Sequence, residues 1–209
     1  DILRIDHFRG FDAYYAIPAG DDTARNGRWR PGPGLALFQA LTAAYGGEMP
    51  IIAEDLGFLS DSVRTLVRET GYPGMKVLEL AFDSRDSGAS DYLPHRIGEH
   101  CVVYTGTHDN DTILGWAATA PAADVAFARD YLKLGDRQDW NWAMMDAAWQ
   151  SPAELAVMQV QDLLGLGHEA RMNTPSTLGE NWLWRLLPGE LTEDLAQTVR
   201  ARMARFGRL

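Results

Sequence analysis

Three carboxylic acids follow short apolar segments of the chain, at positions where they could take part in acid–base or nucleophilic chemistry. Asp6 follows residues 2–5, and the other two acids, Glu54 and Asp109, each follow an apolar run as well. The carboxyl ends of parallel strands open onto one face of an α/β sheet or barrel. We therefore expect the three acids to share an active site, although each of them alone could instead cap the helix that follows its strand.

Arg4 adds to the case for catalysis at Asp6. Side chains along a strand alternate between its two faces, so Arg4 and Asp6 are expected to project to the same side. A guanidinium next to a carboxylate on the same face of a strand keeps that carboxylate ionised, as a nucleophile requires. The second acid of such a pair must instead hold a proton that it can give to the leaving group. Carboxylates paired in this way cleave glycosidic bonds. The alternative for Arg4 is an ion pair with a structural role only.

Other chemistries have weaker signals in the sequence. His7 lies beside Asp6 and His108 lies beside Asp109, so a metal-dependent barrel hydrolase is an open alternative. The sequence has no HxH or HExxH spacing, however, and we expect no metal. It also has no GxGxxG or GKS/GKT phosphate-binding loop, and the lone Cys101 lies in an apolar run that is typical of a core strand. We therefore predict that the protein needs no cofactor.

The composition excludes some classes of partner. The 209 residues carry a formal net charge of −10, which disfavours binding to nucleic acid or to an anionic membrane surface. The chain has no run of about eighteen apolar residues that could cross a membrane. A single cysteine excludes an intrachain disulfide and fits a reducing compartment, so we predict a cytoplasmic location. The oligomeric state is not predicted by any feature of the sequence.

The elements that must position the three acids follow an alternating pattern, which predicts an α/β fold. Apolar β-prone runs predict strands at 2–6, 50–54, 75–80, 101–105 and, more weakly, 170–173. Apolar spacing and capping residues predict helices at 35–45, from Ser60 to Gly71, from Ser151 to about Leu164, and from Thr192 onward. We also predict a helical insertion at about 113–150 and a structured loop at 17–33.

Several segments together match a known family. They are LRIDHFRGFDAYYAIPAG at 3–20, NGRWRPGPG at 26–34, IIAEDLG at 51–57, GYPGMKVLELAF at 71–82, VVYTGTHDNDT at 102–112, and EARMNTPS with NWLWRLLPGEL at 169–191. In these segments the chain resembles the 4-alpha-glucanotransferases, or amylomaltases, of glycoside hydrolase family 77. This resemblance implies a retaining double displacement on alpha-1,4-glucans such as maltose and maltooligosaccharides, without a cofactor. The remaining alternatives are an alpha-glucan hydrolase of the same clan and a catalytically silent glucan-binding fragment.

The resemblance also implies roles for individual residues. Asp6 in RIDHFRG matches the nucleophile, Glu54 in AEDLG matches the general acid/base, and Asp109 in THDN matches the acid that stabilises the transition state. The residues expected to bind the donor sugar are Arg4, His7, Asp83, His108 and Asn173.

In the family's (β/α)8 TIM-type barrel, the nucleophile follows the fourth strand. Here it follows the first strand that the sequence predicts, so we expect residues 1–209 to be the C-terminal part of a catalytic barrel, with its last five βα units. The chain departs from the family pattern at Ser176, where glycine is usual, at Ser84, where an acid is frequent, and at Arg96-Ile97 after His95.

Overall fold

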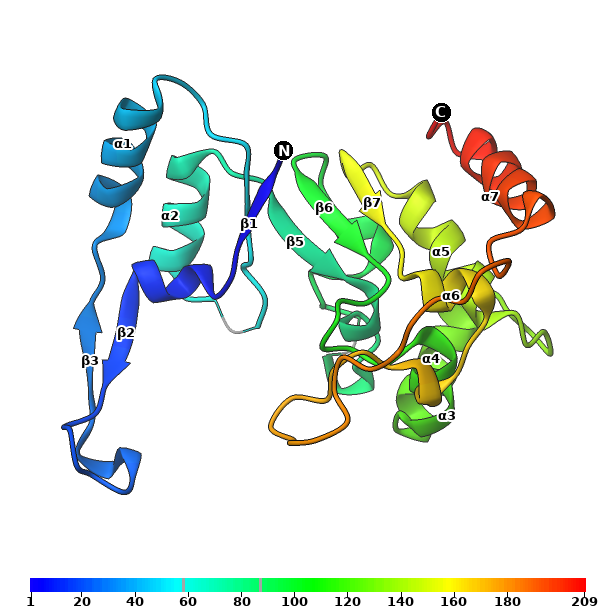
Figure 1. Ribbon diagram of the computed structural model, residues 1–209, viewed down its shortest axis with the longest axis horizontal. Coiled ribbons are helices and arrows are strands. Elements are labelled where there is room, and N and C mark those ends of the chain that lie inside the picture. Colours follow the sequence, from blue (N-terminus) through cyan, green and yellow to red (C-terminus); the bar gives the residue numbers. More distant parts are fainter. Residues whose placement is uncertain (58, 87) are drawn as a thin grey trace. The chain divides into compact units, whose positions relative to one another are not determined.

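The computed structural model describes residues 1–57, 59–86 and 88–209. Contacts within the chain divide it into two compact units, Asp1–Met75 and Lys76–Leu209. Figure 1 shows both units coloured along the sequence. Each unit is described by itself below.

The first unit is built on a short parallel strand pair. Strand β1 (Leu3–Ile5) pairs with β4 (Ile51–Ala53), and their register ends with Ile5 opposite Ala53. Helices α1 (Gly34–Tyr45) and α2 (Asp61–Thr70) contact each other. The unit's core is aromatic, with Phe8 stacked on Phe38 at a centroid distance of 4.9 Å. The strands predicted at 2–6 and 50–54 are confirmed, each slightly shorter than expected.

The ends of both helices follow local signals in the sequence. Helix α1 stops at Gly46, which adopts a left-handed conformation with φ of 84°. Helix α2 is capped by Ser60, whose hydroxyl accepts a hydrogen bond from the N–H of Val63, and it ends before the left-handed Gly71. Both predicted helices are therefore confirmed.

The predicted loop at 17–33 is partly wrong. Residues Arg28–Pro31 form strand β3, which pairs antiparallel with β2 (Ala13–Ala16). Tyr15 and Trp29 pack edge to face across this ribbon, at a centroid distance of 5.5 Å. The glycine- and proline-rich composition of this segment concealed the strand, because cross-strand pairing depends on a partner outside it.

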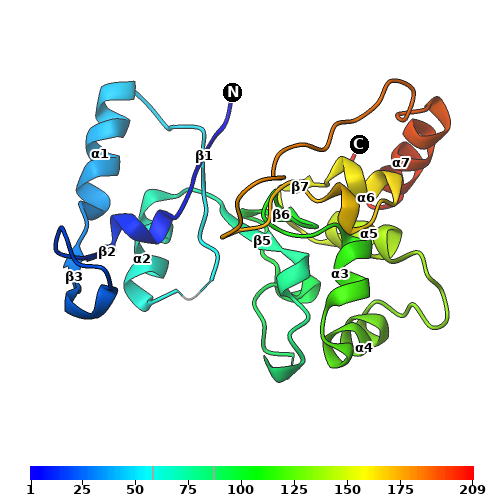
Figure 2. The same cartoon turned by 60° about the horizontal axis from the view of Figure 1, so that its bottom comes forward.

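The second unit contains most of a three-stranded sheet. Its strands are β5 (Gly74–Val77), β6 (Cys101–Tyr104) and β7 (Leu155–Val157), in that order, and β6 and β7 run parallel. The helices are α3 (Ile113–Thr119), α4 (Ala122–Tyr131), α5 (Trp140–Gln150), α6 (Val160–Leu164) and α7 (Glu193–Arg205). Figures 1 and 2 show α3 to α6 grouped on one side of the sheet. Helices α3 to α5 occupy the range predicted as a helical insertion, and α7 starts after Thr192 as predicted.

Two predictions in this unit are wrong. In the first part of the helix expected from Ser151 to about Leu164, the chain forms strand β7, because Val102 to Tyr104 of β6 pair with residues 155–157. Only the last part of the predicted range is helical, as α6. Ser151 instead follows the end of α5, where its hydroxyl donates to the carbonyl of Ala148. The strand expected at 170–173 is absent from the described structure, since residues 168–170 form a single 3-10 turn. Among the described residues, β7 is therefore the last strand.

The predicted strand at 75–80 is shorter than expected. It ends at Val77, and residues Leu78–Leu80 form a 3-10 turn. The architecture as a whole is α/β. In the described residues, no helix is both long enough and apolar enough to cross a membrane.

Candidate active site

In the first unit, Asp6 and Glu54 follow directly on paired strand residues. Ile5 is opposite Ala53 in the β1–β4 register, so each acid is the next residue of its own strand. The N–H of Glu54 donates to the carbonyl of Ile5 at 2.9 Å, which continues the parallel pairing to the acids themselves. Two acids at the same edge of a strand pair are suited to act on one bond.

Arg4 and Asp6 form the ion pair that the alternation along the strand predicts. The distance from Nη1 of Arg4 to Oδ1 of Asp6 is 2.9 Å, and the Asp6 side chain is 74% exposed. The Nε of Arg4 donates to the thioether sulfur of Met75 at 3.2 Å, which fixes the guanidinium on its other side. Asp6 is thus an oriented, accessible carboxylate, as a nucleophile must be.

The carboxylate of Glu54 is oriented by main-chain donors. Its Oε2 accepts from the N–H of His7 at 2.6 Å, and its Oε1 accepts from the N–H of Leu56 at 2.8 Å. Each carboxyl oxygen has a further lone pair, so a proton or a sugar hydroxyl can still bind. His7 reaches this position in a left-handed conformation with φ of 48°, which is costly for a residue with a Cβ atom. The strained residue therefore links the backbone next to Asp6 to the carboxylate of Glu54.

In the second unit, three of the predicted residues lie together. The Nδ2 of Asn173 donates to Oδ1 of Asp109 at 2.6 Å, and Nε2 of His108 lies 3.4 Å from the same oxygen. The N–H of Asn173 also donates to the carbonyl of His108 at 3.1 Å. The Asp109 side chain is 49% exposed, so the carboxylate is accessible while its orientation is fixed.

Trp182 packs against this group. Its ring centroid lies 5.2 Å from that of His108, with 34° between the ring planes. The N–H of Trp182 donates to the carbonyl of Met172 at 2.6 Å, and its φ of 66° is in the left-handed region. An exposed indole held beside polar groups is a surface on which a sugar ring can stack.

Arg171 also belongs to this group, and it was missed by sequence reasoning. Its Nη2 donates to the carbonyl of Asp109 at 2.6 Å, and its Nε donates to the carbonyl of Asn173 at 2.9 Å. Its Nη1 lies 3.9 Å from Oδ2 of Asp111. A single guanidinium therefore joins the two segments that carry Asp109 and Asn173. The sequence feature that could have identified Arg171 is its position in the EARMN segment, two residues before Asn173.

Buried acids lie close to this group. Asp162 accepts from the hydroxyl of Thr105 and from the N–H of Ile113, both at 2.8 Å, and burial raises its pKa to about 6. Burial raises the pKa of Glu79 to about 9, and the charges of Asp162 and Asp111 add to this rise. Glu79 is therefore a neutral carboxylic acid at pH 7.

The structure places Asp83 in a different setting. Its carboxylate accepts from Nε of Arg85 at 2.8 Å and from Nη2 at 2.5 Å. These hydrogen bonds lower the pKa of Asp83 to about 2. The hydrogen bonds of the Asp83 carboxylate in the described structure therefore join it to Arg85, and not to His108, Asp109 or Asn173. Sugar binding by Asp83 stays a prediction.

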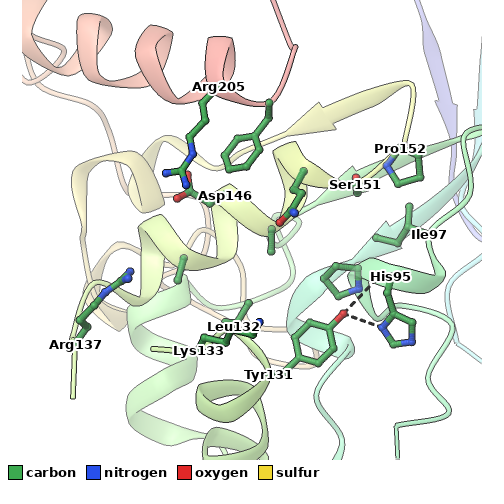
Figure 3. A pocket seen from close by; sticks show the side chains of 15 residues that line it. His95, Ile97, Tyr131, Leu132, Lys133, Arg137, Asp146, Ser151, Pro152 and Arg205 are labelled. Carbon is green, nitrogen blue, oxygen red and sulfur yellow. Dashed lines mark hydrogen bonds between the residues drawn. The ribbon is translucent and has the colours of Figure 1, made fainter. Parts of the chain in front are cut away.

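A cavity of about 660 Å³ lies elsewhere in the second unit. Figure 3 shows Tyr131 and His95 joined by hydrogen bonds at its edge, with Arg205 and Asp146 on another side. None of the predicted site residues is among those that line it. Within the described ranges, no three His, Cys, Asp or Glu side chains gather in a way that could hold a metal ion.

Parallel strands whose carboxyl ends carry oriented, accessible carboxylates are features of an α/β protein, and paired carboxylates are the groups that enzymes acting on glycosidic bonds use. The family model of glycoside hydrolase family 77, described as 4-alpha-glucanotransferase, matches residues 1–192. The chain belongs to this family.

Its relatives include the 4-alpha-glucanotransferase of Thermus thermophilus, which is 48% identical in sequence. The matched region covers 96% of this chain and 41% of that relative. The 4-alpha-glucanotransferase of Clostridium butyricum is 43% identical over 100% of this chain and 42% of the relative. Among solved structures, amylomaltase from Streptococcus agalactiae in complex with acarbose matches with a TM-score of 0.93 and 35% identity, over 100% of this chain and 42% of that one. The chain thus spans about two fifths of the length of these relatives.

Proposed function

We propose that this chain supplies the fourth to eighth strands of a (β/α)8 barrel that transfers alpha-1,4-glucan segments between glucans. In chain order, β1, β4, β5, β6 and β7 would be these five strands, with the β2–β3 ribbon as an excursion after the first. Asp6 then follows the fourth barrel strand, Glu54 the fifth and Asp109 the seventh. This is the family order of nucleophile, acid/base and stabilising acid that the resemblance implies.

In the first step of the proposed reaction, a carboxylate oxygen of Asp6 attacks the anomeric carbon of the donor. The bond from that carbon to the leaving glucan oxygen breaks, and Glu54 gives its proton to that oxygen. In the second step, the 4-hydroxyl of an acceptor glucan or of glucose attacks the same carbon and Glu54 takes its proton. The bond to Asp6 breaks, and the anomeric configuration is retained after two inversions.

One observation supports this mechanism most strongly. The N–H of His7, the residue after Asp6, donates to the carboxylate of Glu54 at 2.6 Å, so the proposed nucleophile and acid/base are linked through one peptide unit. The ion pair of Arg4 with Asp6 further supports a nucleophile whose carboxylate is held in a fixed orientation beside a positive charge.

The substrate class rests on the relatives and on the binding residues. The relatives are named for glucan transfer, and the solved amylomaltase is in complex with acarbose. From these names we extend the substrate class of this chain to alpha-1,4-glucans such as maltose and maltooligosaccharides. In this proposal, Asp109 binds sugar hydroxyls at the transition state. Arg4, His7, Asp83, His108 and Asn173 would line the donor subsite, as the resemblance implies.

The chemistry proposed here needs no metal and no organic cofactor, because the two carboxyl groups supply both the nucleophile and the proton. We place the activity in the cytoplasm because the chain has a single cysteine, which fits a reducing compartment. Nucleic acid and membranes are not among the proposed partners, which agrees with the net charge of −10.

The test is incubation of the full-length translation product that contains this chain with maltotriose. Glucan transfer predicts glucose together with a ladder of maltooligosaccharides longer than the substrate, and Asp6→Asn should abolish both. Glucose and maltose alone would indicate a hydrolase. Binding of maltotriose without turnover would indicate a silent glucan-binding protein, and loss of activity on chelation would indicate a metal-dependent enzyme. Each of these three results would contradict the proposal.

A further inference from the structure

Asp111 has no role in the mechanism proposed above, yet its carboxylate is buried only two residues after Asp109. The Asp111 side chain is 8% exposed. Its Oδ1 accepts from the N–H of Thr112, the residue that caps α3, at 2.8 Å. The carbonyl oxygen of Asp111 accepts from Nε2 of Gln159 at 3.0 Å. Asp111 is thus held through both its side chain and its main chain.

The carboxylate of Asp111 also lies against the first turn of α3. A Cβ atom placed on Gly115 would lie 2.8 Å from Oδ2 of Asp111 and closer still to Oδ1. A side chain at this position would overlap the carboxylate, so Gly115 leaves the space that Asp111 occupies. The helix backbone therefore helps to fix where the carboxylate lies.

The second oxygen of this carboxylate contacts a segment that comes later in the chain. Oδ2 of Asp111 is hydrogen bonded to Nδ1 of His168 at 2.6 Å and lies 3.9 Å from Nη1 of Arg171. His168 is the first residue of the 3-10 turn His168–Ala170, and Arg171 follows that turn. A buried carboxylate needs hydrogen-bonding or positively charged partners, and this segment supplies both.

The same segment leads to Asp109 by direct hydrogen bonds. Nη2 of Arg171 donates to the carbonyl of Asp109 at 2.6 Å, and its Nε donates to the carbonyl of Asn173 at 2.9 Å. Nδ2 of Asn173 then donates to Oδ1 of Asp109 at 2.6 Å. The guanidinium of Arg171 therefore lies near Asp111 through one nitrogen and bonds to the backbone of the Asp109–Asn173 pair through the other two.

We propose that Asp111 is a positioning residue for the Asp109–Asn173 pair, acting through His168 and Arg171. Its carboxylate holds residues 168–171 against the segment that carries Asp109, so that the amide of Asn173 reaches the Asp109 carboxylate. This inference rests on the proposed function, since it takes Asp109 as the acid that contacts the donor sugar. Asp111 itself is buried and contacts no substrate.

An amide in place of this carboxylate isolates the contact with the later segment. The side chain of Asp111→Asn has nearly the same shape and keeps an oxygen that accepts from the N–H of Thr112. It carries no charge, and its other group is a donor that faces the guanidinium of Arg171, which has no acceptor. Asp111→Asn should therefore preserve the start of α3 and loosen residues 168–171.

The first experiment compares maltotriose transfer by variants of the full-length translation product that contains this chain. We expect Asp111→Asn to lower kcat by about 10- to 100-fold with a change in KM below about threefold. The matched control is Asp146→Asn, which breaks a partly buried pair with Arg202 of 2.7 Å elsewhere in the second unit and should keep kcat within about threefold. Parent-like kcat in Asp111→Asn, or an equal loss in Asp146→Asn, would overturn the positioning role.

A double-mutant cycle distinguishes positioning from a general loss of structure. If Asp111 acts through Asn173, the double variant Asp111→Asn with Asn173→Ala should have a kcat within about threefold of Asn173→Ala alone. Independent effects would instead multiply, and a kcat loss equal to the product of the two single losses would overturn the proposal.

A third measurement does not depend on activity. The N–H of Asn173 donates to the carbonyl of His108 at 3.1 Å, and its amide hydrogen exchange should be faster in Asp111→Asn than in the parent and unchanged in Asp146→Asn. Parent-like exchange in Asp111→Asn would overturn the positioning role. Absence of a maltooligosaccharide ladder with the parent protein would overturn the proposed function, while the exchange data would still test whether Asp111 holds this segment.

Discussion

The orientation of Asp109 depends on a short hydrogen bond from Asn173. The amide Nδ2 lies 2.6 Å from Oδ1 of Asp109, and the main chain of Asn173 is bonded to His108 as well. Because Asn173 donates to a carboxylate, it contributes a charge-assisted hydrogen bond as well as a fixed geometry. The residue is therefore central to the shape of the site in the second unit.

Substitution of Asn173 should lower transfer activity in a graded way. Asn173→Ala removes the donor, and we expect kcat for maltotriose transfer to fall about 10- to 100-fold. Asn173→Asp should cost more, because it places a second carboxylate at hydrogen-bond distance from Asp109. Gln197→Ala is the matched control, since it removes an exposed amide–carboxylate bond of 3.2 Å to Glu193 on α7 and should leave kcat unchanged. Equal activity of the two Asn173 variants and the parent would contradict the role of Asn173.

The sequence could predict some of these residues and not others. Asp6, Glu54 and Asp109 are visible because each follows an apolar run and lies in a specific motif. Arg171 could not be identified in this way, because its bond to Asp109 spans 62 positions. The sequence predicts Glu79 inside the strand at 75–80, whereas the strand ends at Val77 and Glu79 lies in the 3-10 turn that follows. Its burial could therefore not be predicted from the strand pattern.

Among the elements, those whose ends are set by local chemistry were predicted well. Gly46 and Gly71 stop their helices, while Ser60 and Thr192 cap theirs, and each of these signals lies within a few residues of the element. Strand β7 was not predicted, because its partner β6 lies about fifty residues earlier in the chain. The order Ser151-Pro152 resembles a helix start but follows a helix end instead.

The turn after Asn173 offers a test of local strain. Ser176 has a φ of 65°, and the N–H of Thr177 donates to the carbonyl of Thr174 at 3.3 Å. With Pro175 in second place, this is the pattern of a type II turn, which favours glycine at the third position. The family usually has glycine there, so the departure noted in the sequence has a structural consequence.

Ser176→Gly should therefore raise the free energy of unfolding by about 0.5–1 kcal/mol, since the left-handed strain it relieves exceeds the entropy that glycine adds to the unfolded chain. Chemical denaturation of the full-length product measures this. Ser176→Ala is the control, because its Cβ atom retains the strain, and its stability should match the parent. A lower stability of Ser176→Gly would show that the turn is not strained.

For the molecule as a whole, the buried acids set a dependence of stability on pH. The pKa of Glu79 is raised to about 9 from an ordinary value of 4.5. Between pH 4.5 and about pH 9, Glu79 is therefore protonated in the folded state and ionised in the unfolded state. The stability from this group is complete below pH 4.5 and is lost as the pH rises through about 9. Asp162, with its pKa raised to about 6, acts in the same direction at lower pH.

Thermal unfolding of the full-length product between pH 6 and pH 9 should show this loss, with a slope of up to about 1.4 kcal/mol per pH unit from one such group. Glu79→Gln should flatten the slope. Glu169→Gln is the control, because backbone hydrogen bonds lower the pKa of Glu169 and it is ionised throughout this range. A slope that is identical in the parent and in Glu79→Gln would contradict a protonated Glu79.

The central claim is that Asp6 forms a covalent bond to the donor sugar, while Glu54 donates a proton to the leaving oxygen and accepts one from the acceptor hydroxyl. The direct measurement is mass spectrometry of Glu54→Gln full-length protein after reaction with α-maltotriosyl fluoride, whose leaving group needs no acid but whose intermediate needs the base to be released. We predict a maltotriosyl adduct on the peptide that contains Asp6, and none when Asp6→Asn is added. Release of fluoride with no adduct, or an adduct on a different residue, would contradict the mechanism.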